Sequence, residues 1–146
     1  SLGGERQVRP TVWSETEWPQ GRKTRWRKFN SPSPAEIDLL PLYENNKRVL
    51  AYAYCQIDCA QARKEKATFG SNDGIEIILN GRTVFKKLVK RNLAVDEDQV
   101  LLDLQQGKNH LLLKIYQGNG GWGFSFQMPD VTVRNHDHRY RIIEQP

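Results

Sequence analysis

The stretch IEIILNGRTVF, residues 75 to 85, predicts a β-hairpin closed by a two-residue turn. Asn80 and Gly81 separate two apolar runs, and an Asn-Gly pair favours the type I′ turn because both central residues need a positive φ angle. We expect Asn80 to act as a turn residue. The turn predicts three cross-strand pairs, namely Leu79 with Arg82, Ile77 with Val84 and Ile75 with Lys86.

The rest of the chain repeats this pattern of short β segments. Helical periodicity is almost absent, and the strongest segments alternate or run apolar between Gly, Asn, Asp or Pro residues. About ten short strands at regular spacing predict an all-β, antiparallel β-sandwich or barrel. The expected strands are 11–18, 24–29, 36–40, 48–58, 66–71, 74–79, 82–89, 99–104, 109–117 and 122–128, with 139–143 as a further edge strand.

The length of 146 residues fits one domain that is large enough to bury a core without disulfide bonds. We interpret residues 1–10 as a linker or remnant and residues 11–146 as a single β-sandwich domain. Hydrophobic residues make up 38% and charged residues 27% of the chain, as is usual for a globular protein. Since no apolar run approaches the ~18 residues that span a bilayer, we expect no membrane span.

Basic residues outnumber acidic ones by 22 to 17, and the excess is concentrated in RKTRWRK (22–28) and KKLVKR (86–91). Such patches attract nucleic acid, an acidic polysaccharide or a membrane surface, although a solvated face is the commoner explanation. The net charge of +5 is modest, and no nucleic-acid module signature is present. We therefore do not expect nucleic acid as the partner.

The two cysteines, Cys55 and Cys59, are four residues apart. In a strand this spacing corresponds to roughly 13 Å, which is beyond disulfide reach unless the chain bends between them. Two cysteines without nearby histidines do not form a zinc site. We expect Cys55 to be a small buried apolar residue, and a bridge to Cys59 only if residues 57–60 form a turn.

No catalytic motif is visible. The sequence has no G-x-S-x-G, no H-E-x-x-H, no phosphate-binding loop and no dinucleotide fingerprint. The corner SNDG (71–74) offers one carboxylate, that of Asp73, to a sugar or to calcium, but calcium needs 6–8 oxygen ligands and no cluster lies nearby. We therefore expect no enzymatic activity, no metal and no cofactor, a structural calcium ion being unsupported.

Aromatic residues give the first candidates for ligand binding. Trp18 lies in a turn-like stretch, and Trp26 follows Arg25 within the basic run 22–28. An aromatic ring beside a cation can stack on a sugar ring. The alternative is that these tryptophans close the sandwich.

The stretch GNGGWGFSF (118–126) contains Trp122 among glycines. Side chains alternate along a strand, so Trp122 shares a face with two phenylalanines, and we expect it in the core. A ligand in this region would instead contact Asn119 and the residues of the polar faces, Tyr116 and Gln127.

Five segments carry a resemblance to a known family: IDL (37–39), VLAYAY (49–54), FGSNDGIEIILNG (69–81), GKNHLLLKIYQ (107–117) and GNGGWGFSF (118–126). With them, residues 37–128 resemble the galactose-binding-domain-like jelly rolls attached to bacterial polysaccharide-processing and other secreted proteins. The corner at residues 71–74 has one carboxylate where similar modules have two. The resemblance implies a jelly-roll β-sandwich, a non-catalytic accessory module of a larger secreted protein, and an extracellular or periplasmic location.

Some modules of this kind bind carbohydrate, and others only pack against a neighbouring domain. Our first hypothesis is a carbohydrate-binding module, and the positive charge would suit an acidic polysaccharide. The alternative is an interaction domain that docks on a neighbouring catalytic domain and has no glycan ligand. The candidate ligand-binding residues are Trp18, Arg25, Trp26, Asp73, Tyr116, Asn119 and Gln127.

Overall fold

The computed structural model describes residues 15–17, 21, 23–29, 36–42, 47–128 and 140–144, and these residues form an all-β protein, as predicted. The described residues include no helix that is long and apolar enough to cross a membrane. The elements are β1 (Glu15–Glu17), β2 (Lys23–Arg25), β3 (Arg27–Phe29), β4 (Ile37–Asp38), the 3-10 helix η3 (Leu40–Leu42), β5 (Val49–Cys59), β6 (Arg63–Ser71), β7 (Ile75–Leu79), β8 (Arg82–Lys87), β9 (Asp98–Leu104), β10 (Gly107–Gln117), β11 (Gly123–Gln127) and β12 (Tyr140–Glu144).

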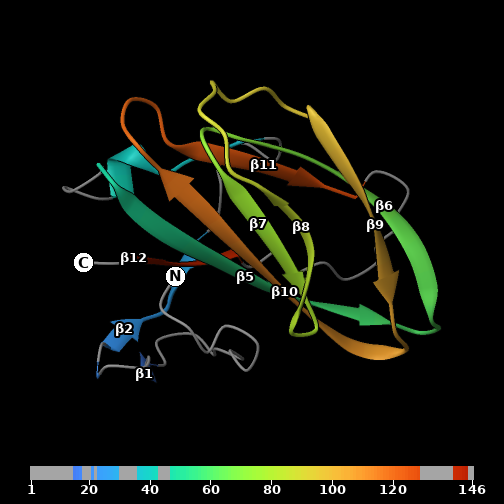
Figure 1. Cartoon of the computed structure of the whole chain (residues 1–146). Helices are drawn as coiled ribbons and strands as arrows, with labels where there is room; N and C mark the ends of the chain where they lie inside the picture. Colours follow the sequence, from blue (N-terminus) through green and yellow to red (C-terminus); the bar gives the residue numbers. More distant parts are fainter. Residues whose placement is uncertain are drawn as a thin grey trace.

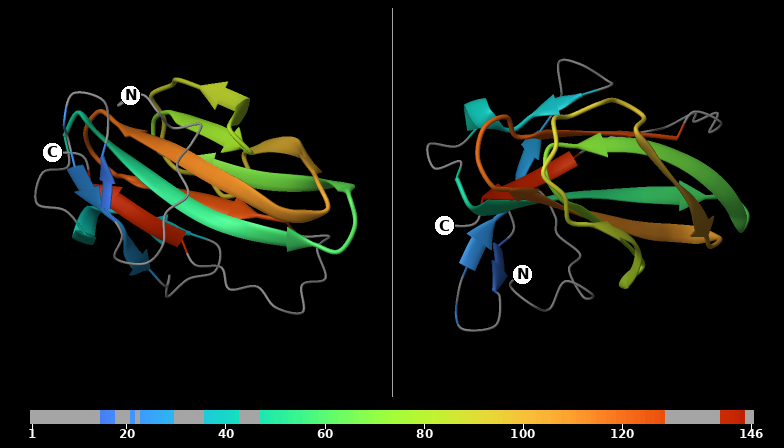
Figure 2. Two further views of the ribbon diagram at one scale, coloured as in Figure 1. Left: turned by 90° about the horizontal axis from the view of Figure 1, so that it is seen from below. Right: turned by 45° about the horizontal axis from the view of Figure 1, so that its top comes forward.

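Two antiparallel sheets form the layers of the sandwich (Figure 1). The first has the order β3-β12-β5-β10-β7-β8 and the second the order β4-β11-β6-β9. The eight strands β4 to β11 are thus arranged as in a jelly roll, since β4, β11, β6 and β9 face β5, β10, β7 and β8. Figure 2 shows the two layers from other sides, with the small β1–β2 hairpin outside them.

The core lies between the two sheets and is built by strand alternation. Leu111, Leu113 and Ile115 of β10 form one buried row, and Trp122 and Phe124 oppose it from the other sheet. Trp122 is 2% exposed, which confirms the prediction that its indole belongs to the core. The alternate side chains of β10 therefore point to the outer face of the six-stranded sheet.

A second apolar cluster covers part of the outer face of the six-stranded sheet. It contains Trp26, Leu50, Tyr52, Tyr54, Ile78 and Leu112. Trp26 is 0% exposed, donates from Nε1 to Oγ1 of Thr16 at 2.7 Å and meets Tyr54 edge to face. Because its ring is enclosed by protein, the prediction of Trp26 as a ligand contact is wrong, and the ring packs on the outer face of the six-stranded sheet instead of between the two sheets.

The Asn80-Gly81 turn forms as predicted, with φ angles of 50° and 79°. Asn80 also fixes the turn to β10, because its Oδ1 accepts a hydrogen bond from the main-chain N–H of His110 at 2.8 Å. The pair nearest the turn, Leu79 with Arg82, is confirmed. An irregularity between Ile77 and Ile78 shifts the next pairs by one residue. Ile77 therefore pairs with Phe85 and Ile75 with Lys87, so the two farther predicted pairs are wrong.

Cys55 and Cys59 both lie in β5, both are buried, and neither forms a disulfide bond. The strand continues through residues 57–59, so the turn that a bridge would need does not form. Burial raises the pKa of the Cys55 thiol to about 12. The prediction of Cys55 as a small buried apolar residue is confirmed.

Candidate functional site

The outer face of the six-stranded sheet carries a buried ion pair where β7 and β10 lie side by side. Glu76 and Lys114 are register partners, and Nζ of Lys114 lies 3.3 Å from Oε2 of Glu76. Their side chains are only 10% and 4% exposed. Nζ of Lys114 also lies 5.9 Å from the ring centroids of both Tyr52 and Tyr116. A buried pair of this kind needs additional polar partners to offset its desolvation.

Neighbouring hydroxyl groups provide those partners for Glu76. Thr83 donates to its Oε1 atom at 2.9 Å, and Tyr116 donates to its Oε2 atom at 3.2 Å. Burial raises the pKa of Glu76, but the hydrogen bond from Thr83 and the charge of Lys114 outweigh burial, so the pKa lies below its ordinary value. Glu76 is therefore an ionised carboxylate at neutral pH that fixes the Tyr116 side chain.

Tyr116 is half-buried and packs against the apolar cluster on the outer face of the six-stranded sheet. A Cβ atom at Gly74 would lie 3.2 Å from Cδ2 of Tyr116 and 3.0 Å from Cδ2 of Leu88, so glycine lets both side chains approach the sheet. Leu88 is 63% exposed. Burial raises the pKa of Tyr116, with Lys114 opposing this effect and Glu76 adding to it, so the phenol stays protonated at neutral pH. We call Tyr116, Gly74 and Leu88 the Tyr116 platform.

Polar groups border the platform where β10 ends. Asp73, at a φ of 49°, accepts a hydrogen bond from the main-chain N–H of Gly118 at 2.7 Å through Oδ2. A Cβ at Gly118 would lie 3.2 Å from that oxygen and 3.9 Å from Cε of Lys90. Asn119 follows and is exposed. Three predicted site residues, Asp73, Tyr116 and Asn119, thus lie in adjoining positions on this side of the sandwich.

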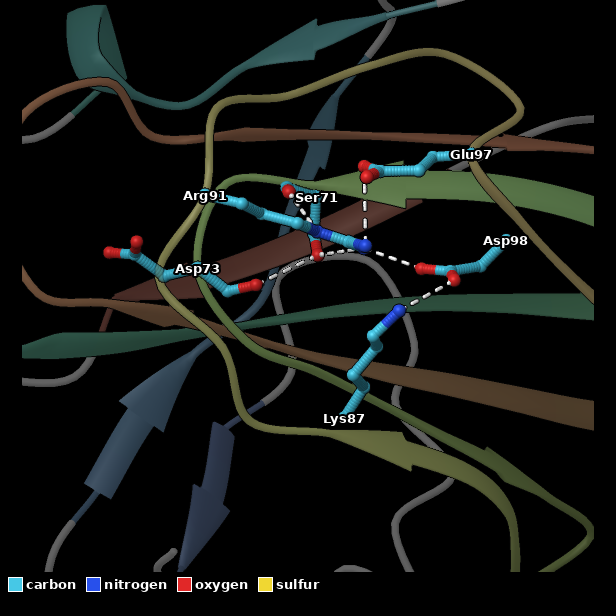
Figure 3. A network of polar contacts seen from close by, with 6 residues as sticks. All are labelled: Ser71, Asp73, Lys87, Arg91, Glu97 and Asp98. Carbon is cyan, nitrogen blue, oxygen red and sulfur yellow. Dashed lines mark hydrogen bonds and ion pairs between the residues drawn. The ribbon is translucent and has the colours of Figure 1, made fainter.

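A polar network fixes the corner that carries Asp73 (Figure 3). Arg91 donates from Nε to the main-chain oxygen of Ser71 at 3.1 Å, and its main-chain oxygen accepts from the N–H of Asp73 at 3.2 Å. Its Nη1 atom pairs with Glu97 at 3.2 Å and its Nη2 atom with Asp98 at 2.6 Å.

The same network fixes the end of β8. Lys87 pairs with Oδ1 of Asp98 at 3.0 Å. Burial raises the pKa of Asp98, but hydrogen bonds from Arg91 and Lys87 outweigh burial and hold the pKa below its ordinary value. Asp98 is therefore ionised at neutral pH and neutralises part of the basic run 86–91.

The segment between β8 and β9, residues 88–97, also contacts the outer face of the four-stranded sheet, and we call it the strap. Oγ1 of Thr68 donates to Asp96 at 2.6 Å. A Cβ atom at Gly70 would collide with the main-chain oxygen of Ala94. The strap therefore depends on a glycine in β6 for its close approach to the sheet.

The other predicted site residues do not join this surface. Trp18 lies outside the described residues. Arg25 is exposed in β2 and pairs with Glu15 at 3.1 Å. Gln127 projects from β11 on the outer face of the four-stranded sheet, whereas Tyr116 projects from the six-stranded sheet. The prediction that Tyr116 and Gln127 border one ligand surface is therefore wrong, because their strands belong to different layers.

Sequence reasoning missed Glu76, Leu88 and Lys114. Glu76 and Lys114 are charged residues inside otherwise apolar strands, IEIIL and LLLKI, and this was the available signal. An acid and a base that each interrupt an apolar strand are candidates for pairing, because an isolated buried charge is costly.

Within the described part of the chain, no group of three or more His, Cys, Asp or Glu residues is placed to hold a metal ion. No protein-family model matches the sequence, and no curated protein is significantly similar to it. The two-sheet antiparallel sandwich agrees with the fold that the resemblance to galactose-binding-domain-like modules implies.

Proposed function

We propose that this domain is a non-catalytic carbohydrate-binding module of a larger secreted protein and that the Tyr116 platform contacts the sugar. The supporting observation is that the half-buried Tyr116 ring and the exposed Leu88 side chain lie side by side over the buried Gly74. Sugar rings have apolar faces and polar edges, and they suit an apolar surface with hydrogen-bonding groups at its border.

The platform is held in place before a ligand arrives. The phenol of Tyr116 is hydrogen-bonded to Glu76, and Glu76 is in turn held by Thr83 and Lys114. A ring that is already ordered loses little side-chain entropy on binding, which favours affinity from a small contact area. The carboxylate of Asp73 and the amide of Asn119 are groups that hydrogen-bond sugar hydroxyls.

The chemistry of Glu76 favours binding over hydrolysis. Glycoside hydrolases use two carboxyl groups, one of which acts as an acid with a raised pKa. The pKa of Glu76 is instead lowered, and both of its oxygens accept hydrogen bonds or the Lys114 charge. Glu76 therefore suits an orienting role behind the ring.

The test is isothermal titration calorimetry against a panel of neutral and acidic polysaccharides. Leu88→Ser removes an exposed part of the platform, and Leu101→Ser is the matched control, because Leu101 is 59% exposed on the four-stranded sheet. We expect Leu88→Ser to weaken binding about fivefold to tenfold, as befits the loss of one apolar contact of ~1 kcal/mol. The control should bind like the wild type. Binding to no polysaccharide in the panel would contradict the proposal.

A second candidate is docking on a neighbouring domain without a glycan ligand. Its support is the exposure of Leu101 (59%) and of Val95 (40%), which belong to β9 and the strap. Docking surfaces bury apolar side chains that are exposed in the isolated domain. If docking is the function, Leu101→Ser should weaken association with the neighbouring domain in the parent protein, while Leu88→Ser should not.

A further inference from the structure

Contacts with acidic residues divide the basic run KKLVKR (86–91) into two sets. Lys87 and Arg91 turn toward Asp98 and form ion pairs with it. Lys86 is the register partner of Glu76 on the outer face, and its charge contributes to lowering the pKa of that carboxyl. The run therefore contains a structural set, Lys87 and Arg91, and a second set that faces the platform.

The second set continues along the strap. Leu88, which is part of the platform, lies beside Gly74, and Lys90 approaches the position where Gly118 follows Tyr116. Lys86, Leu88 and Lys90 thus form a row with an apolar side chain between two amines. Lys86 lies opposite Glu76 in the sheet, whereas Lys90 lies in the strap near Gly118, so the two amines approach the platform at different places.

Neither amine of this row forms an ion pair within the described part of the protein, although the Asp73 carboxylate lies on the same side of Gly118 as Lys90. Lys86 and Lys90 are exposed, and no described acidic side chain forms an ion pair with either. Glu76, the nearest carboxylate to Lys86 in the sheet, is paired with Lys114. Two exposed cations therefore remain beside the Tyr116 platform.

We propose that the ligand of the platform is an anionic polysaccharide, whose acidic groups contact Lys86 and Lys90 while a sugar unit lies on Tyr116 and Leu88. This inference rests on the proposed function and adds the chemical class of the ligand. Because the two amines lie apart, they contact acidic groups on different sugar units. A polymer with repeated carboxylate or sulfate groups meets this requirement.

Nucleic acid fits the same surface less well. A single-stranded nucleic acid is bound by a groove of cations together with several rings on which successive bases stack. The platform has one tyrosine ring, and two exposed lysines lie near it. We therefore favour a polysaccharide over a nucleic acid, and a nucleic acid is included in the test for comparison.

The experiment measures binding of oligogalacturonate and of its methyl ester, which has the same backbone without the charges. Dextran sulfate and dextran form a second matched pair for sulfate groups, and oligothymidylate is the nucleic-acid arm. Each is titrated at low and high salt by calorimetry. We expect at least one acidic member to bind about tenfold more tightly than its neutral counterpart at low salt, and the difference to shrink at high salt because exposed charges are screened.

The decisive variant is Lys86→Gln with Lys90→Gln. Its control is Lys64→Gln with Lys66→Gln, because these exposed lysines of β6 lie on the other sheet and their removal changes the net charge equally. We expect the first double variant to lose the tenfold preference for the acidic glycan, about threefold for each lysine. Binding of a neutral counterpart should be unchanged, and the control should behave like the wild type.

The outcomes separate this inference from the proposed function. Equal binding of acidic and neutral glycans, or an equal effect of both double variants, would overturn the anionic preference and leave glycan binding intact. Failure of every glycan to bind would overturn both. Tighter binding of oligothymidylate than of any glycan, lost in the Lys86→Gln, Lys90→Gln variant, would replace the polysaccharide with nucleic acid.

Discussion

Arg91 and Asp98 are joined by a 2.6 Å contact between Nη2 and Oδ2, and their side chains are only 11% and 13% exposed. Asp98 is the first residue of β9, so the contact closes the strap onto the strand that follows it. Arg91 also donates to Ser71 at the end of β6. This pair therefore holds the strap in the position in which Leu88 completes the platform and Lys90 lies beside it.

Replacing Arg91 with Gln should destabilise the domain by about 3 kcal/mol, because it leaves a largely buried Asp98 with Lys87 as its remaining cation. Arg63→Gln is the control, since it removes the more exposed pair with Glu65 and should cost no more than about 1 kcal/mol. Urea unfolding gives both free energies. Equal losses in the two variants would show that the Arg91 network contributes no more than a surface pair.

Acid should weaken the domain partly through Asp98. Its pKa in the folded protein lies below the ordinary value of 3.8, so its contribution to stability is complete above pH 3.8 and is lost as the pH falls through the folded pKa. Asp98→Asn should be less stable at neutral pH and should lose less stability on acidification. The free energies of unfolding of the wild type and of Asp98→Asn should differ at neutral pH and become similar below pH 3.8. A difference that stays constant across this pH range would contradict the prediction.

The pair of Glu76 and Lys114 should respond differently to single and double replacement. Glu76→Leu leaves the Lys114 ammonium, 4% exposed, without its carboxylate and should cost about 3 kcal/mol. Changing Glu76 to Leu and Lys114 to Met together should restore most of that stability. A double-mutant cycle in urea gives the coupling energy, and additive losses would refute the pairing.

Gly70→Ala should destabilise by about 1 to 3 kcal/mol, because its Cβ would collide with the main-chain oxygen of Ala94 in the strap. Ser125→Ala is the natural control, since Ser125 pairs with Gly70 across β11 and β6. The Ser125 hydroxyl is buried and has no hydrogen-bond partner in the described part of the chain, so its removal should be neutral or slightly stabilising. Thermal unfolding of both variants is the measurement; a Gly70→Ala domain as stable as the wild type would rule out the close contact.

Local patterns were sufficient to predict much of the fold. The Asn80-Gly81 turn needs only two residues with positive φ, and the row that contains Trp122 follows from strand alternation. The shift beyond Ile77 was not predictable in this way, because a strand irregularity depends on how the hairpin packs in the sheet.

The candidate site was predicted less completely, because which residues lie close together depends on the sheet to which each strand belongs. Alternation places Tyr116 and Gln127 each on the polar face of its strand. The local sequence does not indicate that β10 and β11 belong to different sheets. The ion pair of Glu76 and Lys114 joins residues 38 positions apart, which only the pairing of β7 with β10 brings together. Trp26 was misjudged because its aromatic and basic neighbours in the sequence gave no information about the sheet that covers its ring.

The placement of the two cysteines makes the domain convenient for site-specific labelling. Cys55 and Cys59 are the only thiols of the chain, and both are buried against the core in β5. At a pKa of about 12, Cys55 supplies almost no thiolate at neutral pH, and thiolate is the form that reacts with maleimides. A cysteine introduced at the exposed Asn119 would therefore take up a dye selectively. The dye would sit at the border of the Tyr116 platform and report on its ligands without removal of either native thiol.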